Sequence, residues 1–103
     1  MSPIPERWRS KVMTADAAIA MIPDGAFIVQ GSAVGEPPAL LDAVAARVRA
    51  GGLTKLTMTA LLPLAASARS ILAPDVRKVI HWRSIFASGV DRGALAAGEA
   101  SYA

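Results

Sequence analysis

The sequence predicts an α/β fold, a partial open sheet of parallel strands with flanking helices. The main observation is the order of segments between residues 26 and 60. An apolar run is followed by a loop rich in glycine and proline, then by a strongly helical segment and an alternating strand pattern. This order is that of a βαβ unit, whose two strands are parallel and joined by a right-handed crossover. The length of 103 residues fits one domain.

The composition indicates a folded chain with a thin core. Hydrophobic residues make up 53% of the sequence and charged residues 18%, which argues against disorder. Much of the apolar fraction is alanine, and aromatic residues make up only 5%. Alanine buries little area, so such a core gains little free energy per residue. We therefore expect either an exposed apolar face or a partner that covers it: a missing C-terminal half or a second copy of the chain.

Charge and motif content exclude several classes of protein. The net charge is +3, but the basic residues are scattered rather than gathered on one element with aromatics, so we expect no nucleic-acid partner. The chain has no cysteine, and Pro, Gly, Lys or Arg interrupts every apolar run, so we expect no membrane partner. The first residues lack the apolar segment of a secretory signal, which favours a cytoplasmic location.

Residues 1–13 are rich in proline and charge and are interpreted as an N-terminal arm, with residues 14–103 forming the α/β body. Thr14 can cap a helix that runs to about residue 22, with Asp16 in its first turn. Residues 23–25 are a turn in which Gly25 can adopt positive φ. Residues 26–30 are then expected to form a buried strand.

The middle of the chain carries the clearest pattern. Leu40, Leu41, Val44 and Val48 fall on one helical face, and Gly51-Gly52 follow the last turn. A strand over residues 53–60 comes next. It alternates, with one set of side chains expected to face the core and the other to face away: Leu56, Met58 and Ala60 against Lys55, Thr57 and Thr59.

The last third is weaker in pattern. Residues 63–72 predict a weak helix closed by Pro74, and residues 76–82 a third strand that contains His81. Residues 91–97 predict a short helix with Asp91 as N-cap and Gly98 beyond its end. No further element is expected after that helix.

The loop after the first strand is the candidate binding site. Open α/β sheets bind ligands at the carboxyl ends of their strands, and glycines let backbone N–H groups approach a ligand. The loop matches neither the dinucleotide-binding glycine pattern nor the P-loop, so its spacing alone slightly favours a plain structural connection. The candidate substrate-binding residues are Gly31, Ser32, Ala33, Val34, Gly35, Glu36 and Pro37.

No residue carries a clear catalytic or metal signal. Glu36 has no acidic or basic partner in the sequence, and a helix-capping role is favoured over that of a nucleophile. His81 is interpreted as a hydrogen-bonded strand residue rather than a metal ligand. Ser32 and Ser88 lack a visible His/Asp partnership, so a hydrolase triad is not supported.

The chain resembles the N-terminal part of the acetyl-CoA hydrolase/CoA-transferase family. The resemblance begins at Trp8 and Lys11 in the arm and continues through two longer segments. One is "TADAAIAMIPDGAFIVQGSAVGEPPALLDAVAARV". The other is "IFASGVDRGALAAGEASYA", which matches a family motif at Phe86, Gly89, Arg92, Gly98 and Tyr102. The resemblance implies a CoA-thioester substrate, a short carboxylate and transfer of the acyl group through a glutamyl-CoA thioester.

The same resemblance implies that the nucleophilic Glu lies in a part of the family's fold that this chain does not contain. The chain is therefore expected to be a fragment of an acyl-CoA hydrolase or CoA-transferase that is inactive alone. Two alternatives stay open. One is a non-catalytic binding module with the same half-fold, and the other is a sugar-phosphate isomerase-like domain whose loop holds phosphate.

Overall fold

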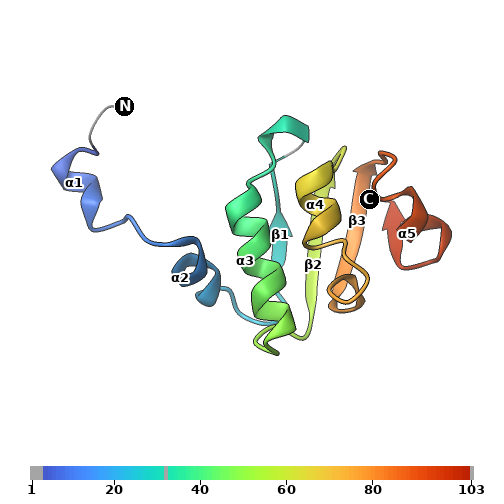
Figure 1. The fold of residues 1–103 in the computed structure, drawn as a ribbon, viewed down its shortest axis with the longest axis horizontal. Helices are drawn as coiled ribbons and strands as arrows, with labels where there is room; N and C mark the ends of the chain where they lie inside the picture. The colour runs from blue at the N-terminus through green and yellow to red at the C-terminus, as the bar shows by residue number, and fades with distance from the viewer. Residues whose placement is uncertain (1–3, 32, 103) are drawn as a thin grey trace.

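A sheet of four parallel strands forms the centre of the computed structural model, which describes residues 4–31 and 33–102 (Figure 1). The strands lie side by side in chain order: β1 (Phe27–Val29), β2 (Leu56–Leu61), β3 (Ile80–Phe86) and β4 (Ala100–Tyr102). Helices α3 (Pro38–Arg49) and α4 (Ala65–Arg69) cover one face of the sheet. The expected α/β class with a partial parallel sheet is confirmed.

The remaining elements are short. They are α1 (Glu6–Arg9), α2 (Ala15–Ala20), the 3-10 helices η1 (Ala33–Gly35) and η2 (Arg77–Val79), and α5 (Arg92–Ala96). Helix α1 buries no residue and stands away from the sheet (Figure 1). Among the described residues, no helix has both the length and the apolar character needed to cross a membrane.

Helix α3 supplies one wall of the core. It begins at Pro38, where a missing N–H costs nothing, and ends before Gly51, whose φ is 82°. Its apolar face is buried against the sheet at Leu41, Val44 and Val48. The opposing strand residues are also buried, and they come from β2 and β3: Leu56, Met58, Ala60, Ile80 and Trp82. The predicted helical period is confirmed at Leu41, Val44 and Val48, although Leu40 is exposed. The predicted core-facing set of β2 is confirmed, although Thr59 of the other set is buried as well.

Helix α2 is held to α3 by the buried side chain of Ile19 and by Arg47. The Thr14 hydroxyl caps α2 by accepting the Ala17 N–H at 3.1 Å, as expected. The guanidinium of Arg47 then donates to the carbonyls of Ile19 and Ile22, each at 2.6 Å. The Ile19 carbonyl also accepts the Ile22 N–H at 3.0 Å, and Arg47 adds a side-chain donor to both carbonyls at the end of α2.

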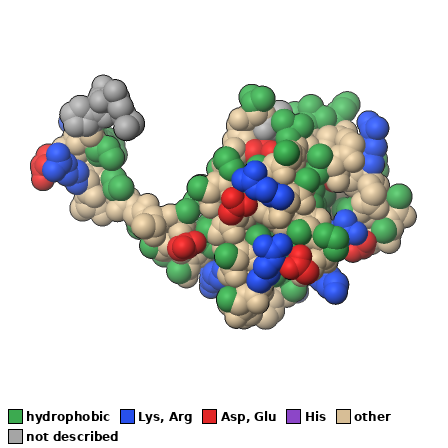
Figure 2. All heavy atoms as spheres, viewed as in Figure 1, with side chains coloured by type: hydrophobic (Ala, Val, Ile, Leu, Met, Phe, Trp, Pro, Cys, Tyr) green, Lys and Arg blue, Asp and Glu red, His purple; other side chains and the backbone are tan. Residues whose placement is uncertain are grey.

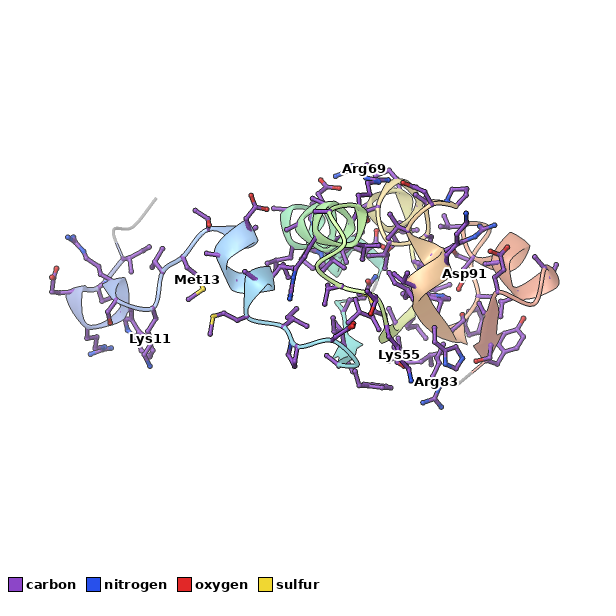
Figure 3. The ribbon with its side chains drawn as sticks, turned by 90° about the horizontal axis from the view of Figure 1, so that it is seen from below. Lys11, Met13, Lys55, Arg69, Arg83 and Asp91 are labelled. Atoms are coloured by element: carbon purple, nitrogen blue, oxygen red, sulfur yellow. The ribbon has the colours of Figure 1, made fainter. Side chains whose placement is uncertain are left out.

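The prediction of a buried first strand is wrong. In β1 the side chains of Phe27 and Val29 are 56% and 68% exposed. Their register partners in β2 are Thr57 and Thr59, so they lie on the face that α3 and α4 do not cover. Figure 3 shows both sides of the sheet, with Arg69 on the helix side and Arg83 on the opposite side. The two side chains are exposed because β1 is an edge strand and no helix of the described chain covers this face of the sheet.

Two further elements differ from expectation. Residues 77–79 form η2, so the third strand begins at Ile80 and continues to Phe86. A fourth strand, β4, follows α5 where no element was expected, and pairs Trp82 with Ala100 in parallel register. Three residues are too few to show a strand period. The strand forms along the edge of β3, after a turn at Gly98, whose φ is 75°, and beside a 2.8 Å ion pair between Glu99 and Arg77.

At the amino edge of the sheet, Asp24 joins the turn before β1 to the start of β2. Its carboxylate accepts the backbone N–H of Thr54 at 2.9 Å and of Lys55 at 2.7 Å, and also binds the Thr54 hydroxyl. The Thr54 hydroxyl and the Lys55 and Thr54 N–H groups lower the pKa of Asp24 from its usual range. Hydrogen bonds to the ionised form favour that form.

At the other edge, Asp91 is completely buried beneath α5. It accepts the Trp82 indole N–H at 2.9 Å and the Ser88 backbone N–H at 2.8 Å. The expected N-cap position is confirmed, but the side chain makes no capping bond to α5. It instead fixes the loop between β3 and α5 onto the largest side chain of the core.

We predict that Asp24→Asn lowers the free energy of unfolding at pH 7, and that its difference from wild type shrinks below about pH 4. The folded-state pKa is depressed, so the contribution is present above the unfolded-state pKa and is lost as the pH falls through the folded-state pKa. Urea unfolding at several pH values measures it. The control is Asp16→Asn, which removes the same charge at a site away from this turn. A difference that widens in acid would contradict the prediction.

We predict that Asp91→Ala lowers the free energy of unfolding by about 3 kcal/mol, because it leaves the buried Trp82 N–H and the part-buried Ser88 N–H without an acceptor. Asp91→Asn keeps one acceptor and should cost less. The control is Asp42→Ala, which removes a carboxylate from an exposed ion pair with Arg69 and should cost at most about 1 kcal/mol. Urea titration followed by tryptophan fluorescence gives the values, and equal losses for Asp91→Ala and Asp42→Ala would contradict the prediction.

Candidate functional site

The carboxyl edge of the sheet is the candidate site. Because all strands are parallel, the segments that leave β1, β2 and β3 emerge together at this edge. Figure 2 shows hydrophobic side chains gathered there, at the top of the view. The exposed apolar residues on these segments include Val34, Leu61, Leu64 and Phe86.

Glu36 ties the first of these segments to the second. Its Oε2 accepts the Leu64 backbone N–H at 3.0 Å, the Ser67 hydroxyl, and more weakly the Gln30 side-chain amide at 3.5 Å. The predicted capping of the following helix is wrong: α3 has Pro37 at its N-cap and no side-chain cap bond. Glu36 turns to the start of α4 because its donors lie there, far along the sequence.

Gly31 is required by the loop itself. A Cβ on Gly31 would collide with the backbone carbonyl of Gly35, whereas a Cβ on Gly35 would meet nothing. The loop therefore folds back on its first residue in the short helix η1. Val34, at its outer turn, is 98% exposed. Ser32 lies outside the described residues.

The second segment is held at each end of its turn. Leu62 has φ 50°, a left-handed conformation uncommon for a branched residue, and its N–H bonds the Phe86 carbonyl at 3.0 Å. The Ser88 hydroxyl donates to the Pro63 carbonyl at 2.6 Å. All three segments are thus joined, the first to the second by Glu36 and the second to the third by Ser88.

An apolar pocket of about 260 Å³ lies between β1, α2 and α3. Gly31 and Pro37 of the predicted site line it, while Glu36 does not. Most other lining residues are aliphatic: Ile19, Ile22, Ile28, Val29, Leu40, Leu41, Val44 and Met58. The structure therefore brings two of the seven predicted residues into one pocket. The predicted site residues otherwise turn to solvent, to α4, or lie outside the described residues.

Gln30 is the polar side chain in the pocket lining, and the sequence analysis missed it as a site residue. Its side-chain amide donates to the Ser67 hydroxyl at 2.9 Å, which directs Oε1 the other way. Oε1 is buried and has no partner among the described residues. A glutamine at the end of an apolar strand is the signal that could have found it. The mainly aliphatic lining of the pocket suits an apolar chain.

A larger hollow of about 520 Å³ lies at the opposite, amino edge, near Lys55, Lys78 and His81. It is on the wrong edge for a ligand site of an open α/β sheet. His81 bonds Ser101 at 3.0 Å, as expected of a hydrogen-bonded strand residue. Within residues 4–31 and 33–102, no group of histidine and acidic side chains could hold a metal ion.

We predict that Gly31→Ala lowers the free energy of unfolding by about 1–3 kcal/mol, because the added Cβ forces the loop apart at a backbone atom that cannot move alone. Gly35→Ala is the matched control in the same loop and should be nearly neutral. Thermal or urea unfolding of both variants measures the difference. Equal effects of the two substitutions would show that the loop does not close as described.

Comparison with known proteins gives a consistent picture. Residues 4–103 match the family described as the acetyl-CoA hydrolase/transferase N-terminal domain. A comparison with curated protein sequences finds no significant match. Among solved structures, RipA from Yersinia pestis is 26% identical with a TM-score of 0.78, and the match covers 88% of this chain and 23% of that one.

Two variants of RipA are similar as well. One is 27% identical over 88% of this chain and 21% of that chain, with a TM-score of 0.82. Another is 28% identical over 84% and 20%, with a TM-score of 0.77. The chain thus spans less than a quarter of the length of these proteins. The match over residues 4–103 shows that the chain belongs to the acetyl-CoA hydrolase/transferase family, in its N-terminal domain.

Proposed function

We propose that this chain is the substrate-side, N-terminal part of an acyl-CoA hydrolase or CoA-transferase, with residues 1–13 as an arm. The observation that carries the proposal is the apolar pocket at the carboxyl edge, which Gly31 and Pro37 border and aliphatic side chains line. An acyl-CoA thioester offers an apolar acyl chain, which matches this lining.

In this proposal the catalytic carboxylate comes from outside the chain. Acyl transfer through a glutamyl-CoA thioester needs a carboxylate that is free to attack the thioester carbon. Oε2 of Glu36 accepts from the Leu64 N–H and the Ser67 hydroxyl and holds the carboxylate against α4, so Glu36 is proposed to position the loop. Residues 31–37 then form a wall of the acyl site. The nucleophilic Glu would reach it from a segment that this chain does not contain.

The pocket supports an acyl ligand over a phosphate. Its lining residues include no Lys or Arg, and the carboxylate of Glu36 lies in the same loop, where it would repel a phosphate. The sugar-phosphate alternative therefore has less support. A non-catalytic acyl-CoA binding module would use the same pocket. Turnover, rather than binding, separates it from an enzyme fragment.

The uncovered sheet face supports a partner. Sheets of parallel strands are normally covered on both faces, yet Phe27, Val29 and Ile85 are exposed here. The RipA chains extend far beyond the matched region. We propose that the rest of a longer polypeptide, or a second copy of the chain, covers this face, and that the protein works in the cytoplasm.

We predict that the chain binds butyryl-CoA and that Leu40→Asp weakens this binding at least about tenfold, because the new charge lines the apolar pocket. Asp at this position lies in the first turn of α3, where the helix dipole favours an anion, so the fold should be kept. Val12→Asp places the same charge at an exposed residue outside the pocket. Isothermal titration calorimetry compares the three proteins, and equal affinities would overturn the assignment of the pocket.

We predict that the purified chain does not exchange the acyl group between acetyl-CoA and labelled acetate. The nucleophile and its oxyanion donors must act together, and the nucleophile is proposed to lie elsewhere. Radiolabel transfer measured by chromatography tests this. Turnover that Glu36→Gln abolishes while the fold stays intact would show that Glu36 is the nucleophile after all.

A further inference from the structure

A second hollow at the carboxyl edge brings together three residues of the motif that runs from Phe86 to Tyr102. It has a volume of about 280 Å³ and is lined by Phe86, Ala87, Arg92 and Tyr102. We call it the Arg92 hollow. Phe86, Arg92 and Tyr102 are separated along the sequence, and the functions discussed so far use none of them.

The fold explains how these residues meet. Phe86 is the last residue of β3, Arg92 the first of α5 and Tyr102 the last of β4. Since β3 and β4 are parallel, their carboxyl ends lie together, and α5 stands beside them (Figure 1). The buried Asp91 fixes the backbone immediately before Arg92. The hollow is therefore built on rigid elements rather than on a free loop.

Arg92 is available to a ligand. It forms no ion pair with any residue that the structure describes, and its side chain is exposed. Most other arginines of the described chain are engaged by an acidic side chain, by backbone carbonyls or by an aromatic ring: Arg7, Arg9, Arg47, Arg49, Arg69, Arg77 and Arg83. Arg92 stands out as a guanidinium that lines a hollow without a partner.

The aromatic residues around Arg92 are unusually open. Phe86 is 62% exposed and Tyr102 is 67% exposed. A guanidinium binds a carboxylate or a phosphate through two parallel hydrogen bonds, and an adjoining aromatic ring provides contact area for the carbon skeleton that carries the anion. Placed at the carboxyl ends of parallel strands, this combination suits an organic anion.

We propose that the Arg92 hollow binds the anionic oxygen group of an organic ligand, with Arg92 pairing the anion and Phe86 and Tyr102 contacting the attached carbon skeleton. The shared chemistry is that of a carboxylate or a phosphate ester. This inference deepens the proposed function and rests on it. The proposed function supplies two possible sources of the anion: the carboxylate that takes or gives the acyl group, and a phosphate of coenzyme A. The Arg92 hollow is distinct from the apolar pocket between β1, α2 and α3, which Gly31 borders.

Residue-resolved NMR titration of the ¹⁵N-labelled chain tests the proposal. The probes are sodium butyrate, the neutral isostere butyramide, and coenzyme A. We expect saturable shifts of the Phe86, Arg92 and Tyr102 amides with butyrate or coenzyme A and none with butyramide. Arg92→Met should weaken this binding about tenfold, as should raised salt, because a charge-assisted pair is lost or screened. Arg7→Met, with the same loss of charge, should not.

The outcomes are separable. Shifts with butyrate identify a carboxylate subsite, and shifts with coenzyme A alone identify a phosphate subsite; both support the proposal. Absence of shifts at these three amides with either anion, or equal affinity in Arg92→Met, overturns it. Circular dichroism checks that the variant is folded, and Arg92→Lys, which keeps the charge, should retain part of the binding. The Gly31 and Leu40 amides report the apolar pocket between β1 and α3, so failure of the proposed function is seen separately.

Discussion

Parallel pairing of the strands is the constraint on which the rest of this structure depends. It sends every strand the same way, so that the segments following β1, β2 and β3 emerge at one edge. There, two side chains join segments that are distant in sequence: Glu36 reaches the start of α4, and Ser88 reaches Pro63. Each bond is ordinary in strength, but together they hold three segments in fixed relation, which a binding site needs.

The same topology leaves the sheet half covered. Helices α3 and α4 lie on one face and bury a small core around Trp82, while the other face presents Phe27 and Val29 to solvent. A small core makes polar contacts more important: Arg47 holds α2, and Asp91 satisfies the indole of Trp82. A domain that stood alone would gain from covering its second face. In the proposed function, another layer of polypeptide covers this open face.

The two hollows at the carboxyl edge differ in chemistry. The one between β1 and α3 is mainly aliphatic, and the Arg92 hollow combines a guanidinium with two aromatic rings. An acyl thioester and an organic anion are chemically different groups, and a family that acts on acyl-CoA meets both. Glu36, the carboxylate of the first loop, is given neither role, because the bonds of its Oε2 to Leu64 and Ser67 hold it against α4.

Local patterns in the sequence were enough to predict the fold class, the period of α3, the cap at Thr14 and the alternation of β2, because each depends on neighbouring residues. Tertiary structure alone decided the rest. The exposure of Phe27 depends on which face α3 covers, β4 exists only because β3 offers it an edge, and the partners of Glu36 lie about thirty residues away. The meeting of Arg92 with Phe86 and Tyr102 is also long-range. Periodicity records which side of an element is apolar, but not which distant residue packs against it.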